Sequence, residues 1–295
     1  MNIAFIGLGN MGSLMAANLI NKGFPVAAYD LLSSPLKKIA VLGARKGTSS
    51  ADAARGAQLV ITMLPQSTDT EEVLFGKQGA AAVLGAGAIV IDMGTGSPSM
   101  IKAMAGRLKE KGVDLLDAPV SGGVGKAKTG KLSIMAAGEE KSYQKALPVL
   151  EAMGEEVFYV GASGNGQTIK LINNMLTGIN LAGICEGMVM GMKAGIEPRL
   201  LLEIINSSSG ESYSSKVKIP NFVFKRDFNG GFKTKLQHKD MNLATNLARE
   251  LKVPAVLGNL AREYYLAAMA KGKGEEDASV IITLLEEVAG TEVKI

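Results

Sequence analysis

The sequence has almost none of the side chains that hold transition metals or cross-link a chain. Its 295 residues include one cysteine, Cys185, and one histidine, His238. A single cysteine cannot close an intrachain disulfide, and one Cys with one His cannot supply the ligands of a typical zinc site. The composition therefore predicts no metal site and is consistent with a reducing compartment.

Aromatic residues and surplus charge are also scarce. Trp is absent, aromatic residues make up 5% of the chain, and 32 Lys and Arg against 28 Asp and Glu give 32 − 28 = +4. Proteins that bind nucleic acids usually carry a basic stripe with stacking aromatics. We therefore expect no nucleic-acid partner, and the mild basicity fits a small anionic substrate better.

The N-terminus lacks the pattern of a signal peptide, which needs a basic segment and a longer apolar run than Ile3–Ile6. Only Ile169–Met192 is apolar enough to suggest a membrane span. Five polar or charged residues interrupt that stretch: Lys170, Asn173, Asn174, Asn180 and Glu186. We expect a cytoplasmic protein with no membrane partner.

The first half of the chain alternates short apolar runs with helical patterns. The expected strands are Ile3–Gly7, Val26–Tyr29, Leu59–Met63, Ile89–Asp92, Asp114–Asp117 and Ser133–Ala136, with a last one near Val157–Val160. The expected helices between them include Met11–Lys22, Pro35–Leu42 and Pro98–Lys111. Such alternation predicts an α/β fold with parallel strands and right-handed crossovers, a doubly wound sheet of the Rossmann type.

The second half shows helical periodicity and no convincing strand. The expected helices are Gln167–Ala194, Pro198–Ser207, Leu236–Leu251, Val253–Ala270 and Ala278–Val288. A Gly- and Ser-rich segment, residues 161–166, separates the two patterns. We therefore predict a dinucleotide-binding domain over residues 1–162 and an all-α domain over residues 163–295, joined by a long helix.

The residues Gly7, Leu8, Gly9, Asn10, Met11 and Gly12 match the pattern G-x-G-x-x-G. The motif follows an expected strand and opens an expected helix, which is the context that gives it meaning. The first Gly allows a tight turn, the second lets the backbone approach a pyrophosphate, and the third permits close packing of helix on strand. The phosphates would then meet the N–H groups at the start of the helix. The pattern predicts a dinucleotide site.

Asp30 ends the second expected strand, where a carboxylate accepts hydrogen bonds from the adenosine ribose. The same charge repels the 2′-phosphate of NADP, and no Arg follows to compensate, so we expect NAD. The alternative is that Asp30 caps the next helix. Leu64, Pro65 and Thr95 follow later strands and are expected at the same edge of the sheet. Thr95 could contact the cofactor, or it could cap the helix that begins near Ser97.

Lys170 and Asn174 lie near the start of the long, apolar helix. A Lys on a helix that is apolar nearly all round is costly to bury, which makes it a functional candidate. Residues four apart share a helix face, so Asn174 could hold the Lys170 ammonium or bind a substrate hydroxyl. Reduction of an aldehyde by hydride leaves an alkoxide, and Lys170 could give it a proton and take the proton back in oxidation. The alternative is a Lys that reaches from the first turn into solvent. For His238, a packed or supporting role is favoured.

Taken together, these residues resemble the 3-hydroxyisobutyrate dehydrogenase (β-hydroxyacid dehydrogenase) family, which includes tartronate semialdehyde reductases and 2-hydroxymethylglutarate dehydrogenases. The resemblance covers essentially the whole chain and rests on four motifs in order. They are Phe5–Gly12, Asp117–Gly123 with Ala127, Gly130 and Leu132, the Gly166, Lys170, Asn173 and Asn174 helix, and Lys239-Asp240.

This resemblance implies an NAD-dependent oxidoreductase that interconverts a small 3-hydroxy acid and its semialdehyde. It implies that Lys170 is the catalytic acid/base and that Asn174 assists it. Ser121, Gly122 and Gly123 would bind the substrate carboxylate, as a hydroxyl and backbone N–H groups suit an anion. Thr95 and Lys239 would lie near the nicotinamide. Family members are oligomers, so a homodimer or homotetramer is expected.

Alternatives remain at this stage. An imine reductase shares the architecture but prefers NADP and generally lacks Lys at position 170. A 6-phosphogluconate dehydrogenase would need a longer C-terminal domain, and a non-catalytic NAD-binding module would have lost the Lys. The Ser-rich segment Ser207–Tyr213 looks similar to that of 2-hydroxymethylglutarate dehydrogenases and suits a polar substrate tail, but helix capping would also explain it.

Overall fold

A six-stranded sheet forms the centre of the N-terminal part of the chain. Its strands are β1 (Ile3–Ile6), β2 (Val26–Tyr29), β3 (Arg45–Lys46), β4 (Leu59–Thr62), β5 (Ile89–Asp92) and β6 (Asp114–Asp117). The strand order is β3-β2-β1-β4-β5-β6, and every neighbouring pair is parallel. The predicted Rossmann-type doubly wound sheet is confirmed.

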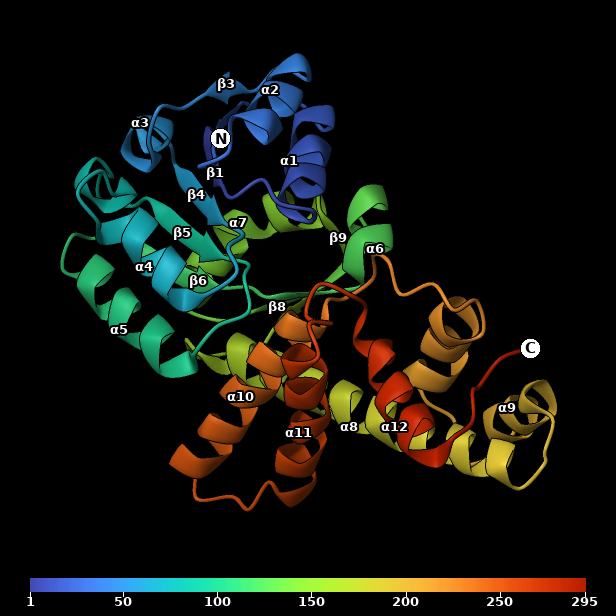
Figure 1. The fold of residues 1–295 in the computed structure, drawn as a ribbon. Coiled ribbons are helices and arrows are strands. Elements are labelled where there is room, and N and C mark those ends of the chain that lie inside the picture. The colour runs from blue at the N-terminus through green and yellow to red at the C-terminus, as the bar shows by residue number, and fades with distance from the viewer. The chain divides into compact units, whose positions relative to one another are not determined.

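Helices cover both faces of this sheet, which is why its central strands read as continuous apolar runs. They are α1 (Gly12–Asn21), α2 (Ser33–Val41), α3 (Ser50–Ala54), α4 (Ser67–Phe75), the short 3₁₀ helix η1 (Ala80–Ala82), α5 (Pro98–Lys109) and α7 (Glu140–Glu151). Helix α6 (Gly123–Thr129) packs against α1. Ile3 and Phe5 share a core with residues of α1 and α7, whereas Ala4 and Ile6 share one with α3, α4 and α5. Figure 1 shows these two groups of helices on opposite sides of the strands.

A second, smaller sheet follows β6. It contains β7 (Val120–Ser121), β8 (Leu132–Ala136) and β9 (Gly154–Tyr159), with β7 antiparallel and β9 parallel to β8. The sequence predicted parallel pairing throughout and missed β7. Only residues 122–131 connect β7 to β8, which is shorter than the dozen or more residues that a parallel crossover needs.

The C-terminal part is helical, as predicted. Its helices are α8 (Asn165–Lys193), α9 (Pro198–Asn206), the π-helix η2 (Ser214–Val223), α10 (Thr234–Glu250), α11 (Val256–Ala270), the 3₁₀ helix η3 (Ala278–Ile281) and α12 (Ile282–Ala289). Leu181, Cys185 and Met188 of α8 share one apolar core with Met241 of α10 and Tyr265 of α11. By length and composition alone α8 could span a membrane, but here it supplies the centre of a helical core.

The computed structural model describes all residues 1–295, and its contacts group them into two units, Met1–Lys170 and Leu171–Ile295. The domain boundary predicted after Ala162 stays a prediction. The division at Lys170 falls inside α8. The start of that helix, up to Lys170, therefore belongs with the sheet.

Candidate active site

The glycine-rich turn joins β1 to α1 and has the geometry that a dinucleotide needs. Gly7 has φ of +96°, and a Cβ on it would lie 2.5 Å from the Met63 carbonyl oxygen. A Cβ on Gly12 would lie 2.0 Å from the Gly7 carbonyl oxygen, so α1 packs directly on the turn. A Cβ on Gly9 would meet nothing within 4 Å. The turn is closed towards the protein at Gly7 and Gly12 and open at Gly9, which leaves room for a pyrophosphate at the start of α1.

Asp30 follows β2 and is tied to this turn. Its Oδ2 accepts a hydrogen bond from the Leu8 N–H at 2.6 Å, and its Oδ1 accepts one from the Leu32 N–H at 2.7 Å. It does not cap the first turn of α2, whose N-cap is Leu32 with no side-chain cap. A carboxylate has about four lone-pair sites, so both oxygens can still accept from ribose hydroxyls.

Further loops at the carboxyl ends of β4 and β5 lie beside the glycine-rich turn. Besides the Met63 oxygen, a Cβ on Gly7 would lie 2.8 Å from Leu64, and a Cβ on Gly94 would lie 2.6 Å from the Leu64 carbonyl oxygen. The predicted residues Leu64 and Pro65 after β4 and Thr95 after β5 are thus on adjacent loops. Ser97 rather than Thr95 is the N-cap of α5, because its side chain accepts from the Met100 N–H. The structure places these loops where open α/β sheets bind ligands.

A buried carboxylate, Asp92, fixes the loops after β4 and β5 to each other. Asp92 is fully buried, and its Oδ1 accepts hydrogen bonds from the hydroxyls of Thr62 at 2.7 Å and Thr70 at 3.2 Å. Burial raises the pKa of Asp92 to about 6, although the bonds from Thr62 and Thr70 act in the opposite direction. Asp92 therefore links the end of β5 to the end of β4 and to α4.

The first turn of α8 is fixed to the sheet by a second buried carboxylate. Asp117 at the end of β6 accepts hydrogen bonds from the N–H groups of Gly164, at 2.7 Å, and Gln167, at 3.0 Å. Burial raises the pKa of Asp117, against the effect of these backbone bonds. Lys170 follows on the same helix and is only 7% exposed. The alternative interpretation of the sequence required the Lys170 side chain to extend into solvent. Because the side chain is buried, that alternative is wrong.

Asn174, one turn after Lys170 on α8, belongs to a polar cluster with α10. Its Nδ2 donates to Asp240 Oδ2 at 2.6 Å, and its backbone carbonyl accepts from Gln237 Nε2 at 3.0 Å. Asp240 is 1% exposed and also forms an ion pair with Lys239 at 3.1 Å. Because a carboxylate only accepts, Asp240 fixes which way the Asn174 amide points. We call Asn174, Gln237, Lys239 and Asp240 the α8–α10 cluster.

Ser121, Gly122 and Gly123 lie at the end of β7 and the start of α6. Gly122 and Gly123 have φ of +125° and +64°, a backbone path that favours glycine. A Cβ on Gly122 would lie 2.6 Å from Lys126 Cδ, whereas a Cβ on Gly123 would meet nothing within 4 Å. Both glycines are exposed, so a ligand can reach the segment. Its role in binding a carboxylate stays a prediction.

Two further sequence candidates have structural roles. His238 on α10 is within 3.3 Å of Asn242 one turn later, and burial together with the charge of Arg262 lowers its pKa. In the Ser-rich segment, the Ser207 hydroxyl donates to the Ile204 carbonyl oxygen, and Ser212 and Ser215 bond reciprocally at the start of η2. These serine hydroxyls therefore make local hydrogen bonds at the end of α9 and the start of η2.

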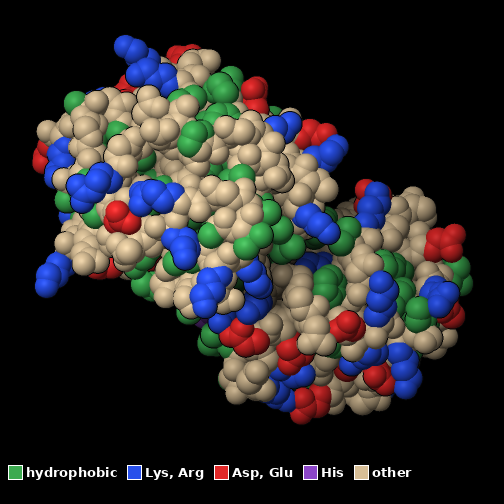
Figure 2. All heavy atoms as spheres, turned by 90° about the horizontal axis from the view of Figure 1, so that it is seen from above, with side chains coloured by type: hydrophobic (Ala, Val, Ile, Leu, Met, Phe, Trp, Pro, Cys, Tyr) green, Lys and Arg blue, Asp and Glu red, His purple; other side chains and the backbone are tan.

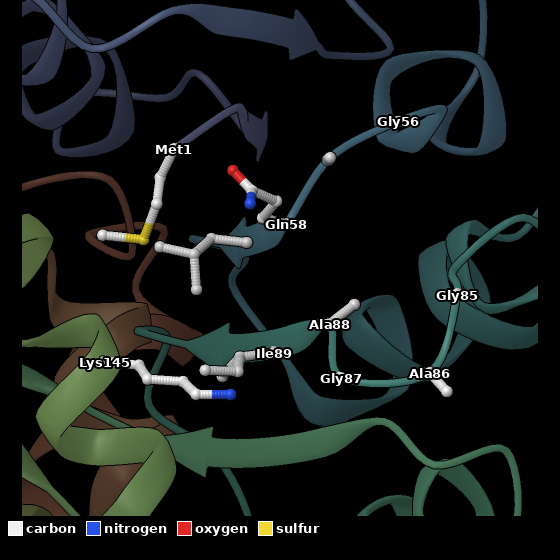
Figure 3. Close-up of a pocket in the computed structure, with 11 residues that line it drawn as sticks. Met1, Gly56, Gln58, Gly85, Ala86, Gly87, Ala88, Ile89 and Lys145 are labelled. Atoms are coloured by element: carbon white, nitrogen blue, oxygen red, sulfur yellow. The ribbon is translucent and has the colours of Figure 1, made fainter.

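A hollow of about 590 Å³ lies at the opposite edge of the large sheet, where β4 and β5 begin. Figure 3 shows Met1, Gln58, Ala88, Ile89 and Lys145 around it. Its lining is mostly Gly, Ala and aliphatic residues, with Lys145 as the one ionisable side chain. Ligands of open α/β sheets bind at the carboxyl ends of strands, so we assign the cofactor to the glycine-rich turn and not to this hollow.

The charged surface gives no competing site. Figure 2 shows Lys and Arg side chains spread over one face among Asp and Glu. Most ion pairs are exposed, such as Arg107 with Glu71 and Lys131 with Glu155. The chain also has no group of three or more His, Cys, Asp or Glu residues placed to hold a metal ion. The residues with candidate chemistry are therefore the glycine-rich turn and Lys170 in the first unit and, separately, the α8–α10 cluster in the second.

Sequence reasoning missed three residues that organise this site, namely Asp117, Gln167 and Asp240. Asp117 and Asp240 stood inside quoted motifs but received no role, and Gln167 received none. Polar residues at a strand end or in the first turn of a buried helix are the only signal for them, because their partners are distant in sequence. Their bonds are visible only in the folded chain.

The strand order, the glycine-rich turn and Asp30 define a dehydrogenase of the Rossmann type that binds a nicotinamide dinucleotide. Two family models divide the chain between them. Residues 2–161 match the NAD-binding domain of 6-phosphogluconate dehydrogenase, and residues 164–285 match the model described as NAD-binding of NADP-dependent 3-hydroxyisobutyrate dehydrogenase.

Individual proteins are similar over nearly their whole length. The chain is 38% identical over 291 residues to 2-(hydroxymethyl)glutarate dehydrogenase of Eubacterium barkeri, covering 99% of this chain and 97% of that one. It is 39% identical to mitochondrial 3-hydroxyisobutyrate dehydrogenase of Rattus norvegicus, with 97% and 87% covered. A solved structure of 3-hydroxyisobutyrate dehydrogenase from Mycobacterium tuberculosis with L-serine has a TM-score of 0.90 and 32% identity, with 96% and 98% covered.

The chain belongs to the 3-hydroxyisobutyrate dehydrogenase (β-hydroxyacid dehydrogenase) family. It is an NAD-dependent oxidoreductase that acts on CH–OH groups of small hydroxy acids. The predicted family, enzyme class and nicotinamide cofactor are confirmed. The roles of individual residues stay predictions.

Proposed function

We propose that the enzyme interconverts a small acid of the form HOCH₂–CHR–COO⁻ and its semialdehyde, with Lys170 as general acid/base. The observation that carries this proposal is a Lys that is 7% exposed, one helical turn before an equally buried Asn174. A buried ammonium is costly unless it has a function or close partners. A role in proton transfer accounts for its burial, whereas a role in surface solubility does not.

Lys170, Asn174 and the Ser121–Gly123 segment have distinct parts in the proposed reaction. NAD, held by the glycine-rich turn and Asp30, would supply the hydride acceptor in oxidation, and NADH would supply the hydride in reduction. Neutral Lys170 takes the hydroxyl proton during oxidation, and the ammonium form gives it back to the developing alkoxide in reduction. The Asn174 amide nitrogen carries a second N–H besides the one that it donates to Asp240, and this N–H donates to the substrate oxygen. Ser121 and the N–H groups of Gly122 and Gly123 hold the carboxylate.

The cofactor is NAD in preference to NADP. Asp30 supports this preference, because hydrogen bonds from the N–H groups of Leu8 and Leu32 hold its carboxylate beside the glycine-rich turn. A 2′-phosphate would meet a like charge there. The residues after Asp30 are Leu31 and Leu32, so no cation compensates.

The substrate class follows the chemistry that the similar proteins share. Their names and the structure's ligand specify 2-(hydroxymethyl)glutarate, 3-hydroxyisobutyrate and L-serine. Each has a primary alcohol on the carbon next to the one that bears a carboxylate, and they differ only in R. A segment that grips the carboxylate and a Lys that addresses the alcohol would serve all of them, so R remains the property to measure.

Initial rates of NADH and NADPH oxidation against a panel of acidic aldehydes test this proposal. The panel contains tartronate, succinic and methylmalonate semialdehydes, 2-formylglutarate, sulfolactaldehyde and glyoxylate. Oxidation of 3-hydroxyisobutyrate, L-serine and 2-(hydroxymethyl)glutarate tests the reverse direction. An NADH-linked rate with an aldehyde of the form OHC–CHR–COO⁻ supports the proposal, and the aldehyde that reacts identifies R. Binding of NADH with no turnover of any compound would instead favour a non-catalytic NAD-binding module.

The homodimer or homotetramer and the cytoplasmic location expected from the sequence also stay proposals. Several apolar side chains of the helical unit are exposed in the single chain, among them Met190, Leu257 and Leu260. Burial of such side chains against a second copy would support an oligomer. Light scattering on the purified protein measures its mass directly.

A further inference from the structure

Gln167 is a buried polar side chain for which the proposed reaction has no role. Its exposure is 0%, and its amide makes two hydrogen bonds to one loop. Nε2 donates to the Gly94 carbonyl oxygen at 2.9 Å, and Oε1 accepts from the Gly96 N–H at 2.9 Å. Because an amide oxygen cannot donate and its nitrogen cannot accept, only one orientation of Gln167 satisfies both bonds. The two bonded groups flank Thr95 on either side.

The same residue is anchored to the sheet through its backbone. Its N–H donates to Asp117 Oδ2 at 3.0 Å, and the Gly164 N–H donates to Asp117 Oδ1 at 2.7 Å. A Cβ on Gly166 would lie 2.4 Å from the Met135 carbonyl oxygen and 2.8 Å from the Asp117 carbonyl oxygen. The start of α8 therefore has no room to shift or rotate against the ends of β6 and β8.

Gln167 also lies three residues before Lys170, and residues three apart share a helix face. The loop that carries Thr95 is thus fastened to the face of α8 that carries Lys170. All of these residues belong to one unit, Met1–Lys170. The distance between the Thr95 loop and the start of α8 is set by two hydrogen bonds from a single amide.

We propose that Gln167, anchored by Asp117, is a positioning residue that holds the Gly94–Thr95–Gly96 loop in register with Lys170. This inference rests on the proposed role of Lys170. Its consequence is a specific kinetic pattern, because the clamp sets the placement of Lys170 against the Thr95 loop and leaves the glycine-rich turn and Asp30 untouched. Turnover depends strongly on Gln167, whereas NADH affinity changes little, because the glycine-rich turn and Asp30 supply most of the cofactor contacts.

Two variants test the proposal in the full-length enzyme. Gln167→Met has a similar size but makes neither hydrogen bond, and misplacement by about 1 Å can cost on the order of 100-fold in rate. We expect kcat to fall by about 10- to 100-fold, with the Kd for NADH, from its fluorescence, unchanged within about twofold. A kcat equal to that of wild type, or equal losses of kcat and NADH affinity, would overturn the proposal.

Gln167→Glu gives a second readout that does not depend on how well Gln167→Met folds. A protonated carboxyl has one O–H donor and an acceptor, so it can make both bonds, whereas a carboxylate cannot donate to the Gly94 carbonyl oxygen. Burial raises the pKa of a carboxyl, which brings this change into the working range. The ratio of kcat for Gln167→Glu to kcat for wild type should therefore rise as pH falls from about 8 to about 5.5. A ratio that stays flat contradicts the proposal.

Gln144→Glu is the matched control, because Gln144 is exposed on α7. Its kcat ratio to wild type should stay near one at every pH. Lys170→Ala, run in parallel, separates the two levels of inference. If wild type turns over and Lys170→Ala does not, but Gln167→Met keeps full kcat, only the positioning role is wrong. If Lys170→Ala also keeps full kcat, the proposed function itself is wrong.

Discussion

The glycine-rich turn and the polar residues of α8 and α10 are built in different ways. The turn is made almost entirely of backbone: Gly7 and Gly12 leave no room for a side chain, and Gly9 leaves space for a ligand. The residues of α8 and α10 are the opposite, because Lys170, Asn174 and Asp240 place buried functional groups on regular helices. One site depends on missing side chains and the other on buried ones.

This difference explains what each site tolerates. A backbone site fails when atoms are added, since a methyl group fills the ligand's space or forces the turn apart. A buried side-chain site fails when atoms are removed, since polar partners lose their hydrogen bonds. Substitutions that add or remove single groups therefore test this difference between the two regions.

Removing the Lys170 amine should have the largest effect. General acid–base catalysis contributes about 10²- to 10⁴-fold in rate, so Lys170→Ala should lower kcat by about 10³-fold. NADH should still bind, because the glycine-rich turn is untouched. Steady-state kinetics give kcat, and fluorescence titration gives the Kd for NADH.

Lys193→Ala is the control for this change, because Lys193 is exposed at the far end of the same helix. It should keep the rate of wild type. Retention of more than about a tenth of the kcat by Lys170→Ala would sink the acid/base role, since such a loss is smaller than proton transfer normally supplies.

The buried Asp92 should make stability depend on pH. Burial raises the pKa of Asp92 to about 6, whereas an Asp in the unfolded chain titrates near 3.9. Between these values the folded chain keeps a proton that the unfolded chain has lost, so the free energy of unfolding falls as pH rises. The loss is on the order of 3 kcal/mol from pH 4 to pH 7, at about 1.4 kcal/mol for each pKa unit.

Asp92→Asn should remove this component, because Asn cannot ionise yet keeps an oxygen for the hydroxyls of Thr62 and Thr70. Urea unfolding of both proteins at several pH values measures the difference. That difference should change across pH 4 to 7 in the direction that makes wild type relatively less stable at the higher pH. Glu110→Gln, at an exposed carboxyl, should show no such trend, and a flat difference for Asp92→Asn would contradict its raised pKa.

The sequence predicted the backbone site better than the side-chain site. Strands β1, β4 and β5 are buried on both faces, so their continuous apolar runs predicted them correctly. The G-x-G-x-x-G spacing located the turn. The strand Arg45–Lys46 is two exposed residues long and gave no apolar signal. The hydrogen bond of Asn174 to Asp240 spans 66 positions, and that of Gln167 to Gly94 spans 73. No periodicity encodes such pairs, because they exist only after the helices have packed.

Adding one methyl group at two positions of the turn should separate stability from binding. Gly12→Ala places a Cβ 2.0 Å from the Gly7 carbonyl oxygen, and overpacking of this kind costs about 1–3 kcal/mol. Gly9→Ala meets nothing within 4 Å, so its stability should stay within about 0.5 kcal/mol of wild type. NADH binding should nevertheless weaken by about tenfold or more in Gly9→Ala, because the methyl group occupies the pyrophosphate's approach.

Thermal unfolding and NADH titration of the two variants provide the check. Gly12→Ala should lower the melting temperature, whereas Gly9→Ala should lower only the affinity for NADH. Equal stability losses in both variants would mean that Gly9 serves packing and not ligand approach. Unchanged NADH affinity in Gly9→Ala would move the pyrophosphate away from this turn.

Asp30 is the one side chain on which the backbone site depends, and changing it should have the smallest effect. Asp30→Ala removes the hydrogen bond that Oδ2 accepts from the Leu8 N–H. It also removes the charge that opposes a 2′-phosphate. The ratio of kcat/KM for NADH to that for NADPH should fall about tenfold, which equals about 1.4 kcal/mol. Asp30→Asn separates the two causes, because its amide oxygen can still accept from Leu8 while its charge is gone. If the charge of Asp30 dominates, kcat/KM for NADPH should rise to the same extent in both variants. If the hydrogen bond to Leu8 dominates, only Asp30→Ala should have a lower kcat/KM for NADH. A wild-type enzyme that already prefers NADPH would show that Asp30 does not set the cofactor.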